Sequence, residues 1–440
     1  MQTILPAHGV GGAQDLPIPA GYAITGAGVA VAVSFIVLVL AWRRPRFDGT
    51  RTGIPLRPHL ASTIDSTWLR IVARTLGMLI LAYLVWALWG PDLASNPIFG
   101  IVYVLLWVGL VPASLALGPV WRALNPLRTL HAGITRTAGA SARDGFIPLP
   151  AWVGYWPAAL GLFAFVWLEL VHPASTYLAP LQGWLALYVL FVLGGAVLFG
   201  PKWFARADPF EAYSTLIAHL SPIGRTREGT LVWQSPLNHL DGLNPTPSRV
   251  AIVAVLLGST AYDSFSRSTT WAKLSQTIGI NPTVSGTLVL LAFCVFVWAT
   301  LTAGTMATTP PPNTPRRALP ALFAHSVVPI IVGYIVAHYL TLLLEYGQMV
   351  LIQISDPMVN GSNLFGTAEW SVNYFLSGNP TTLAVIKVAA VVAGHVIGVI
   401  SAHDRAVKIL PKRHQVTGQL ALLAVMVVYT VGGLYLLFSG

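Results

Sequence analysis

The sequence predicts an all-α polytopic membrane protein, and three observations support this fold class. Hydrophobic residues make up 55% of the chain and charged residues only 9%, whereas about a quarter of the residues in a soluble domain are charged. Apolar runs long enough to span a bilayer recur along the chain. Basic residues gather in alternate connections between these runs.

Ten apolar runs come close to the roughly 20 residues that a membrane-spanning helix needs. They lie near residues 20–42, 71–90, 97–117, 152–172, 181–199, 250–265, 284–306, 319–345, 381–401 and 416–438. The sixth run is the shortest, and tryptophans near the ends of several runs are typical of the membrane interface. The sequence therefore predicts about ten transmembrane helices.

Basic residues predict the orientation of this bundle. Of the 25 Lys and Arg residues, 22 fall in five segments that alternate along the chain. The segments are 43–74, 118–150, 200–249, 307–318 and 402–414. Since basic loops are retained on the cytoplasmic side of the bacterial plasma membrane, both termini are expected outside the cytoplasm. Orientation and contact with anionic lipids then account for the net charge of +10, so nucleic acid is not an expected partner.

The chain outside the helices divides into a tail, a linker and a cap. Residues 1–19 lack the basic and apolar regions of a signal peptide, which predicts an exported tail unless an upstream start codon supplies a cleaved leader. The Pro-rich segment 307–318 predicts a stiff cytoplasmic linker. It would join a seven-helix part, 20–306, to a three-helix part, 319–440. The turn-rich stretch 346–380 predicts an extracytoplasmic cap.

Two segments that are expected to be cytoplasmic resemble each other. They are Gly118 to Leu127 and Gly200 to Phe210. Each places Asn-Pro or Asp-Pro about seven residues after Gly-Pro, and Asn or Asp at an N-cap followed by Pro is a good helix start. We therefore expect short amphipathic helices on the inner surface near 126–136 and 209–220. The spacing indicates a duplicated helix pair, although convergent helix starts would give the same pattern.

Ionisable residues within or beside the spans are the best candidates for function. The sequence contains no phosphate-cradling loop, no zinc-hydrolase motif and no Cys-x-x-Cys. The one cysteine, Cys294, lies in an apolar run and is expected to be a small buried residue. Membranes tolerate ionisable side chains poorly unless those side chains are paired or functional.

Four such residues belong to the eighth and ninth runs. His338 and Glu345 are seven residues apart, and Lys387 and His395 are eight apart on a helix that runs the other way. If the two helices touch, Glu345 and Lys387 form a rung near the outer boundary. His338 and His395 then form a second rung about 10–12 Å deeper. A buried ion pair over two satisfied histidines is the purely structural alternative.

A second group is expected on the same outer side. Glu169 and His172 end the fourth run with Glu-x-x-His spacing, which places both on one helix face and is used by carboxylate metal sites. Asp263 ends the sixth run, and His8 belongs to the tail. Taken singly, each residue is more often an interfacial polar side chain.

Taken together, these residues match the nitrogen and oxygen ligands of Zn, Mn or Fe. A divalent metal would lower the pKa of bound water and so create a hydrolytic nucleophile. The expected ligands are His8, Glu169, His172, His338 and His395, and the expected catalytic carboxylates are Asp263 and Glu345.

Several short stretches carry a resemblance to a known family. They are Ala7–Gly12 with Asp15–Pro19, Ala337-His338-Tyr339, Glu345–Gln348, Gly394-His395 and His403-Asp404-Arg405. Together they resemble actinobacterial integral-membrane proteins described as fenitrothion hydrolases, and the resemblance covers most of the chain. It implies hydrolysis of an apolar organophosphate ester in the membrane. It brings no established catalytic residues with it. For His403-Asp404-Arg405 a structural role at the end of the ninth helix is expected instead.

Three functions therefore stay open at the level of sequence. The first is a metal-assisted hydrolase that takes its ester from the bilayer. The second is a proton-linked or metal-ion permease, which requires ionisable residues that continue from the outer cluster through His395 to His403. The third is a haem-binding or assembly-factor protein with His338 and His395 as axial ligands.

Overall fold

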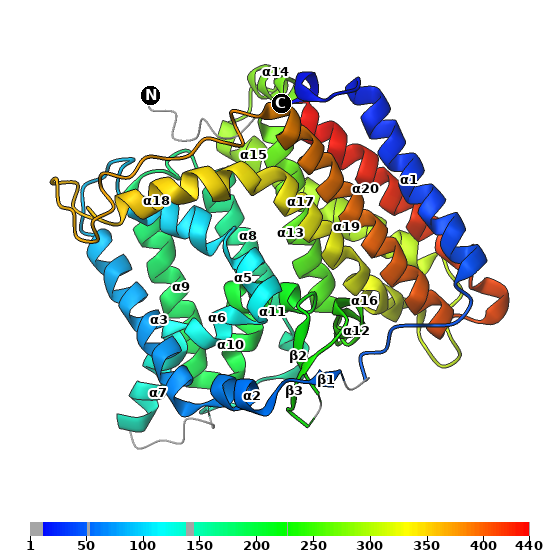
Figure 1. The fold of residues 1–440 in the computed structure, drawn as a ribbon, viewed down its shortest axis with the longest axis horizontal. Coiled ribbons are helices and arrows are strands. Elements are labelled where there is room, and N and C mark those ends of the chain that lie inside the picture. Colours follow the sequence, from blue (N-terminus) through cyan, green and yellow to red (C-terminus); the bar gives the residue numbers. More distant parts are fainter. Residues whose placement is uncertain (1–11, 51–52, 138–144, 227, 440) are drawn as a thin grey trace. The chain divides into compact units, whose positions relative to one another are not determined.

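The computed structural model describes residues 12–50, 53–137, 145–226 and 228–439, and it is nearly all-α (Figure 1). Each of the ten apolar runs forms helix. Within the described residues, eight helices are long and apolar enough to cross a membrane. A ninth is added if Pro97–Leu106 and Leu110–Leu117, which meet at 43°, form one bent span. The all-α prediction is confirmed, while the ten-span count and the orientation stay predictions.

The chain forms two compact units, and each is built from separate stretches. The described residues of unit 1 come from Thr50–Pro236 and Tyr346–Val372, and those of unit 2 from Leu5–Gly49, Leu237–Glu345 and Asn373–Gly440. The Pro-rich segment 307–318 does not divide them, because the helices before and after it both belong to unit 2 and contact each other.

Unit 1 contains five long helical stretches, several short helices and a small sheet. Its elements are β1 (Ile54–Pro55), α2 (Pro58–Asp65), α3 (Thr67–Ala87), α4 (Pro97–Gly100), the π-helical η2 (Ile101–Leu106), α5 (Leu110–Leu117), α6 (Val120–Leu124), α7 (Pro126–Thr137), η3 (Ala151–Val153), α8 (Trp156–Leu170), α9 (Leu178–Phe199), α10 (Lys202–Ala207), α11 (Pro209–Ala218), β2 (Ile223–Arg225), β3 (Leu231–Trp233) and α18 (Gly347–Gln353).

Unit 2 is a bundle of long helices. Its elements are η1 (Ala13–Asp15), α1 (Ala20–Ala41), α12 (Pro236–Asp241, after its first residue), α13 (Pro247–Ser266), α14 (Thr269–Thr277), α15 (Pro282–Met306), η4 (Arg316–Ala318), α16 (Leu319–Phe323), η5 (Ala324–Val327), α17 (Val328–Thr341), the π-helical η6 (Leu342–Tyr346, up to Glu345), α19 (Pro380–Ile409), η7 (Lys412–His414), η8 (Thr417–Gln419) and α20 (Leu420–Phe438). Helices α1, α19 and α20 pack against one another, and α17 packs against α19 (Figure 1).

Small residues allow α17 and α19 to pack backbone against backbone. A Cβ at Gly394 would lie 2.6 Å from the carbonyl oxygen of Pro329, and one at Gly398 would lie 2.7 Å from that of Ser326. Gly333 faces α19 in the same way. The Gly-x-x-x-Gly spacing on α19 is a common device for close helix contact in membranes. This contact fixes the position of His338 on α17 relative to α19.

Helix α13 lies at the centre of unit 2 and is longer than the short sixth run predicted. It contacts α15, α17 and α20, and most of its residues are buried. It is not among the eight helices of the described chain that are long and apolar enough to cross a membrane, because Ser259, Thr260, Asp263 and Ser264 make its second half polar. These polar side chains are buried inside the unit.

Three basic segments of unit 2 meet at one end of the bundle. The Asp404 carboxylate accepts hydrogen bonds from Trp42 Nε1 (2.9 Å) and from the backbone N–H groups of Arg46 (2.6 Å) and Phe47 (3.1 Å). His403 Nε2 donates to the carbonyl oxygen of Trp42 at 3.0 Å. These contacts fasten the segment after α1 to the end of α19, which agrees with a structural role for this pair.

Asp241 joins the third basic segment to the same end. Its carboxylate accepts from Arg405 (2.9 Å), Lys408 (3.0 Å) and the backbone N–H of Gly49 (3.0 Å). Although burial alone would raise it, the pKa of Asp241 is held below its usual value, because both cations and the Gly49 N–H favour the carboxylate. These three basic segments of unit 2 thus share one end of the bundle.

Unit 1 brings the two similar segments together at equivalent positions. In each, a glycine with positive φ (Gly118 at 82°, Gly200 at 75°) ends a long helical stretch, and a short helix then leads to the capping residue. Asn125 Oδ1 caps α7, Asp208 Oδ1 caps α11, and Asn125 Nδ2 donates to Asp208 Oδ2 at 2.7 Å. Three residues further on in each helix, Arg128 and Glu211 form a two-pronged ion pair.

The ion pair between Arg128 and Glu211 strengthens the contact between the two similar segments. Arg128 Nε and Nη2 donate to the two oxygens of Glu211 at 2.7 and 2.6 Å. The Glu211 side chain is 2% exposed, and such bidentate contacts are stronger than single hydrogen bonds. Equivalent residues of the two segments therefore contact each other.

The two predicted inner-surface helices differ in their surroundings. Helix α7 has two buried residues, Leu127 and His131, and the rest of its length is partly or fully exposed, as expected of a surface helix. Nearly all of α11 is buried, from Pro209 to Ala218. The expectation of an exposed surface helix over 209–220 is not met, because aromatic residues of α6, α8 and α9 pack around Phe210.

A three-stranded antiparallel sheet in unit 1 was not expected from the sequence. The strand order is β1-β3-β2, with Trp233 opposite both Ile54 and Ile223. The strands are two or three residues long and lie within basic segments. Strands of this length are too short to show the alternation by which a strand is recognised.

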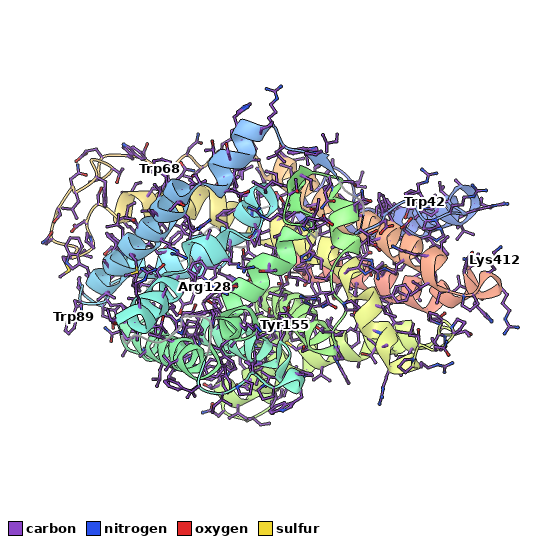
Figure 2. The ribbon with its side chains drawn as sticks, turned by 90° about the horizontal axis from the view of Figure 1, so that it is seen from below. Trp42, Trp68, Trp89, Arg128, Tyr155 and Lys412 are labelled. Atoms are coloured by element: carbon purple, nitrogen blue, oxygen red, sulfur yellow. The ribbon has the colours of Figure 1, made fainter. Side chains whose placement is uncertain are left out.

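Exposed tryptophans lie at both ends of α3. Trp68 is 67% exposed near its first residue and Trp89 is 82% exposed just after its last (Figure 2). A helix of 21 residues is about 31 Å long, close to the thickness of a bilayer core. The two indole rings are thus spaced as interfacial anchors of one spanning helix would be.

The buried Asp208 carboxyl makes the stability of unit 1 depend on pH. Burial, and the nearby charge of Glu211, raise the pKa of Asp208 to about 6. Because the folded-state pKa of Asp208 lies above its usual value of 3.8, protonated Asp208 favours the folded state. This contribution to the free energy of unfolding is fully present below about pH 4. That contribution, about 3 kcal/mol, is lost as the pH rises through 6.

We therefore expect the unfolding temperature of the protein in detergent to fall between pH 4.5 and 7.5, and Asp208→Asn to remove that part of the fall. Circular dichroism melting curves at several pH values provide the measurement. Asp65→Asn is the control, since the Asp65 side chain is 50% exposed. Parallel pH profiles for the wild type and Asp208→Asn would contradict the expectation.

Candidate functional site

A buried carboxylate on α13 organises a polar cluster in unit 2. Asp263 Oδ2 lies 2.8 Å from His338 Nε2 and accepts a hydrogen bond from the Tyr339 hydroxyl, also at 2.8 Å. Asp263 Oδ1 accepts from Arg267 Nε at 3.0 Å. The side chains of Asp263 and His338 are only 2% and 8% exposed. One carboxylate thus holds a histidine, a tyrosine and an arginine together.

The cluster continues on the other side of the imidazole. Ser264 Oγ lies 3.1 Å from His338 Nδ1 and 2.9 Å from the Tyr334 hydroxyl. The Tyr334 hydroxyl also lies 3.2 Å from the carbonyl oxygen of Gly433 on α20, so its one hydrogen is donated either to that oxygen or to Ser264 Oγ. A chain of polar groups therefore runs from Asp263 through His338, Ser264 and Tyr334 to a third helix.

Helical spacing brings these side chains together. Asp263 and Ser264 are neighbours on α13, and Arg267 follows Asp263 by one turn. Tyr334 and His338 are also one turn apart, and their rings stack with centroids 6.3 Å apart. Residues at i and i+4 share a helix face, so α17 presents both rings to the polar second half of α13.

Hydrogen-bond chemistry fixes the direction of the chain. An ionised carboxylate can only accept, so His338 Nε2 donates to Asp263. In the neutral imidazole Nδ1 is then an acceptor, and the Ser264 hydroxyl donates to it. A proton that arrives at His338 Nδ1 would displace this serine hydrogen bond, and the resulting imidazolium would face the carboxylate of Asp263. The arrangement suits proton uptake and release.

Glu345 is held by a different partner from the one predicted. Its carboxylate accepts from the backbone N–H of Ser377 (2.8 Å) and from the Ser377 hydroxyl (2.5 Å). Lys387 is buried on α19, and it is close enough to Asp15 for the two charges to attract each other. Glu345 thus anchors the chain just before α19.

His395 lies on α19 with one nitrogen engaged. Its Nδ1 donates to the carbonyl oxygen of Val391 at 2.9 Å, and the residue is 1% exposed. Its Nε2 is buried and has no hydrogen-bond partner among the described residues. Since Nδ1 carries the proton, Nε2 presents a buried lone pair. The predicted rung with His338 is not a hydrogen-bonded pair, because the ring nitrogens of His338 contact Asp263 and Ser264.

Two of the other predicted ligands belong to the other unit. Glu169 and His172 belong to unit 1, where His172 Nδ1 accepts from the backbone N–H of Ala174 at 3.1 Å. Glu169 lies within electrostatic range of Tyr103 and Tyr213. His8 lies outside the described residues.

Among the described residues, no group of three or more His, Cys, Asp or Glu side chains is arranged to hold a metal. The ring nitrogens of His338 already contact Asp263 and Ser264. A Zn, Mn or Fe ion on this histidine would need one of those contacts to break, so the donor set does not fit a metal in this arrangement. The metal stays a prediction from the sequence.

Sequence reasoning singled out Asp263 and His338 but missed their neighbours. Ser264, Tyr334 and Tyr339 are hydroxyl residues within apolar helices, and Arg267 resembles an ordinary interfacial charge. The available signal was spacing: Tyr334 precedes His338 by one helical turn, and Arg267 follows Asp263 by one turn.

Loss of the central carboxylate should destabilise unit 2. Asp263→Ala leaves Arg267, His338 and Tyr339 without their shared acceptor. We expect the free energy of unfolding to fall by about 3 kcal/mol, because removal of one partner of a buried charged contact leaves the other partner without compensation for its lost hydration. Denaturant titration of the detergent-solubilised protein measures this loss.

The matched control is Asp48→Ala. Asp48 lies 3.5 Å from Lys408, and these side chains are 37% and 34% exposed. Exposed pairs contribute about 0–1 kcal/mol, so this variant should unfold almost as the wild type does. If Asp263→Ala and Asp48→Ala lowered the free energy of unfolding equally, Asp263 would contribute no more to stability than an exposed carboxylate does.

Comparison with known proteins gives no match to a family model, a curated protein or a solved structure. Function is therefore argued from the geometry of the site.

Proposed function

We propose that the protein is a proton-linked membrane permease in which Asp263 and His338 form the proton-exchange site. The observation that carries the proposal is the continuous polar chain from Asp263 through His338 and Ser264 to Tyr334, buried inside an apolar helix bundle. Ionisable groups in such surroundings are costly and mark ion or proton pathways. Histidine is the side chain whose charge changes most readily near neutral pH.

A second set of contacts extends the route toward the basic end of the bundle. On α19, His395 presents its buried Nε2, and His403 lies eight residues further on, about 12 Å along the helix. A cavity of about 10 Å³ lies beside this part of α19, and Gln419 is the one polar residue in its lining of Phe35, Val399, Ala402, Gln419, Leu422, Leu423 and Met426. This is about the size of one water molecule. A permease requires protons to pass from the outer cluster to His403, so in this proposal water must enter the mostly apolar stretch between His395 and His403.

Charge displacement after a pH jump tests this proposal without knowledge of the transported solute. The protein is reconstituted in liposomes adsorbed on a solid-supported membrane, and the transient current that follows proton binding is recorded. We expect a clear transient in the wild type and at least a tenfold smaller one in Asp263→Asn and His338→Gln. Asp65→Asn, which removes an exposed carboxylate of unit 1, should retain the full transient. An undiminished current in Asp263→Asn and His338→Gln would refute the proposal.

A second candidate function rests on the same residues. Ser264, His338 and Asp263 have the sequence of contacts of a nucleophile, a base and an orienting carboxylate, with ring nitrogens 3.1 Å from the serine and 2.8 Å from the carboxylate. In this candidate, His338 Nδ1 removes the proton of Ser264 as the oxygen bonds to the phosphorus of an apolar phosphoester, the P–O bond to the leaving alcohol breaks, and His338 returns the proton to that alcohol. This agrees with the resemblance to organophosphate hydrolases.

Covalent labelling separates the two candidates. A fluorophosphonate probe would form a bond from Ser264 Oγ to phosphorus and release fluoride if the serine is activated. Mass spectrometry of the labelled protein should then find the adduct on Ser264 in the wild type and none in His338→Gln. The absence of an adduct on Ser264, together with a normal pH-jump current, leaves the permease as the function.

A further inference from the structure

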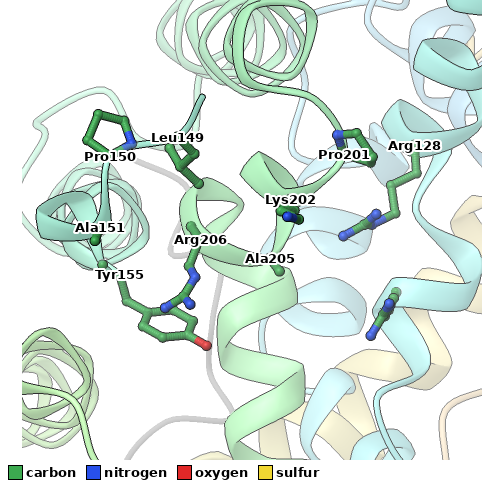
Figure 3. A pocket seen from close by; sticks show the side chains of 11 residues that line it. Arg128, Leu149, Pro150, Ala151, Tyr155, Pro201, Lys202, Ala205 and Arg206 are labelled. Carbon is green, nitrogen blue, oxygen red and sulfur yellow. The ribbon is translucent and has the colours of Figure 1, made fainter. Parts of the chain in front are cut away.

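A cavity in unit 1 gathers positive charge. It has a volume of about 490 Å³ and is lined by eleven residues, none of them Asp or Glu. The four cationic side chains around it are Arg122, Arg128, Lys202 and Arg206 (Figure 3). All four come from the two similar segments and the helices that these segments begin.

Two of these side chains are held in place by aromatic rings. The Arg206 guanidinium lies 4.3 Å from the centre of the Tyr155 ring, and that of Arg128 lies 4.7 Å from the centre of the Phe204 ring. Figure 3 shows Arg206 beside Tyr155, with Lys202 between Arg206 and Arg128 in this view. Cation–π contacts of this kind position a guanidinium without cancelling its charge.

The positive charge of the cavity is only partly neutralised. Glu211 pairs with Arg128, while Arg122, Lys202 and Arg206 form no ion pair within the described residues. Arg122 and Lys202 are exposed and can turn toward a ligand. Three uncompensated cations around one cavity favour an anion with several acceptor oxygens, such as a phosphate group.

The rest of the lining is apolar. Leu149, Pro150, Ala151 and Ala205 border the same space as the cations. A cavity of this volume accommodates a small organic molecule, and ligand sites typically combine apolar walls with a few polar groups. We propose that this cavity binds a phosphate monoester or diester that carries an organic group, as an acidic phospholipid head group does.

The expected side of the membrane agrees with this ligand. Both segments are basic connections, which the charge pattern predicts to be cytoplasmic, where anionic lipid head groups attract basic residues. The site belongs to unit 1, so it is independent of the proton-exchange site proposed in unit 2.

The test uses the full-length protein and two probes. In nanodiscs of phosphatidylcholine with 20% phosphatidylglycerol, native mass spectrometry counts the phosphatidylglycerol that the protein retains. In pure phosphatidylcholine nanodiscs, a thermal-shift titration with inorganic phosphate tests the free anion. Lys202→Gln with Arg206→Gln removes two charges from the cavity. Arg316→Gln with Arg317→Gln, two exposed arginines of another basic segment, is the matched control.

We expect the wild type and the control to retain at least one phosphatidylglycerol. The cavity variant should bind it roughly 30-fold more weakly, at about 1 kcal/mol for each basic side chain. Retention of phosphatidylglycerol without a thermal shift from inorganic phosphate identifies the head group as the ligand, and a thermal shift from inorganic phosphate that the cavity variant loses identifies a soluble phosphate. Equal lipid retention by the cavity variant and the control, without a phosphate response, would overturn the proposal.

Discussion

The cost of placing a charge away from water governs the polar architecture of both units. An isolated buried carboxylate is penalised by several kcal/mol, so it persists only where donors surround it. Asp208 and Asp263 meet this requirement with donors from more than one segment, and Glu345 meets it with the backbone N–H and the hydroxyl of Ser377. Each buried acid therefore ties parts of the chain together that are distant in sequence.

The helices could be predicted from sequence because apolar length is a local property. Each of the ten runs forms helix, and the segments that follow Asn125 and Asp208 begin helices where their caps require it. The short strands could not be predicted, since their pairing with Trp233 depends on tertiary contacts. The burial of α11 was also missed, because its amphipathic pattern does not reveal that other helices cover the remaining face.

The candidate site was predictable in its ionisable members but not in its connections. Asp263 and His338 stand out because ionisable residues are rare in apolar helices. Glu345 was assigned to Lys387 by depth alone, whereas the structure gives it Ser377, a residue that carries no signal in the sequence. Serine and tyrosine hydroxyls are common in helices, so only the fold decides which of them complete a polar chain.

The contact between the two similar segments of unit 1 limits how similar their sequences can be. Matching positions of the two copies touch, as across a two-fold axis. Identical copies would set arginine against arginine, or glutamate against glutamate, at the position of Arg128 and Glu211. Like charges repel at that separation, so the contact requires the copies to differ there. Divergence at this position is thus a condition for the two halves to associate within one polypeptide.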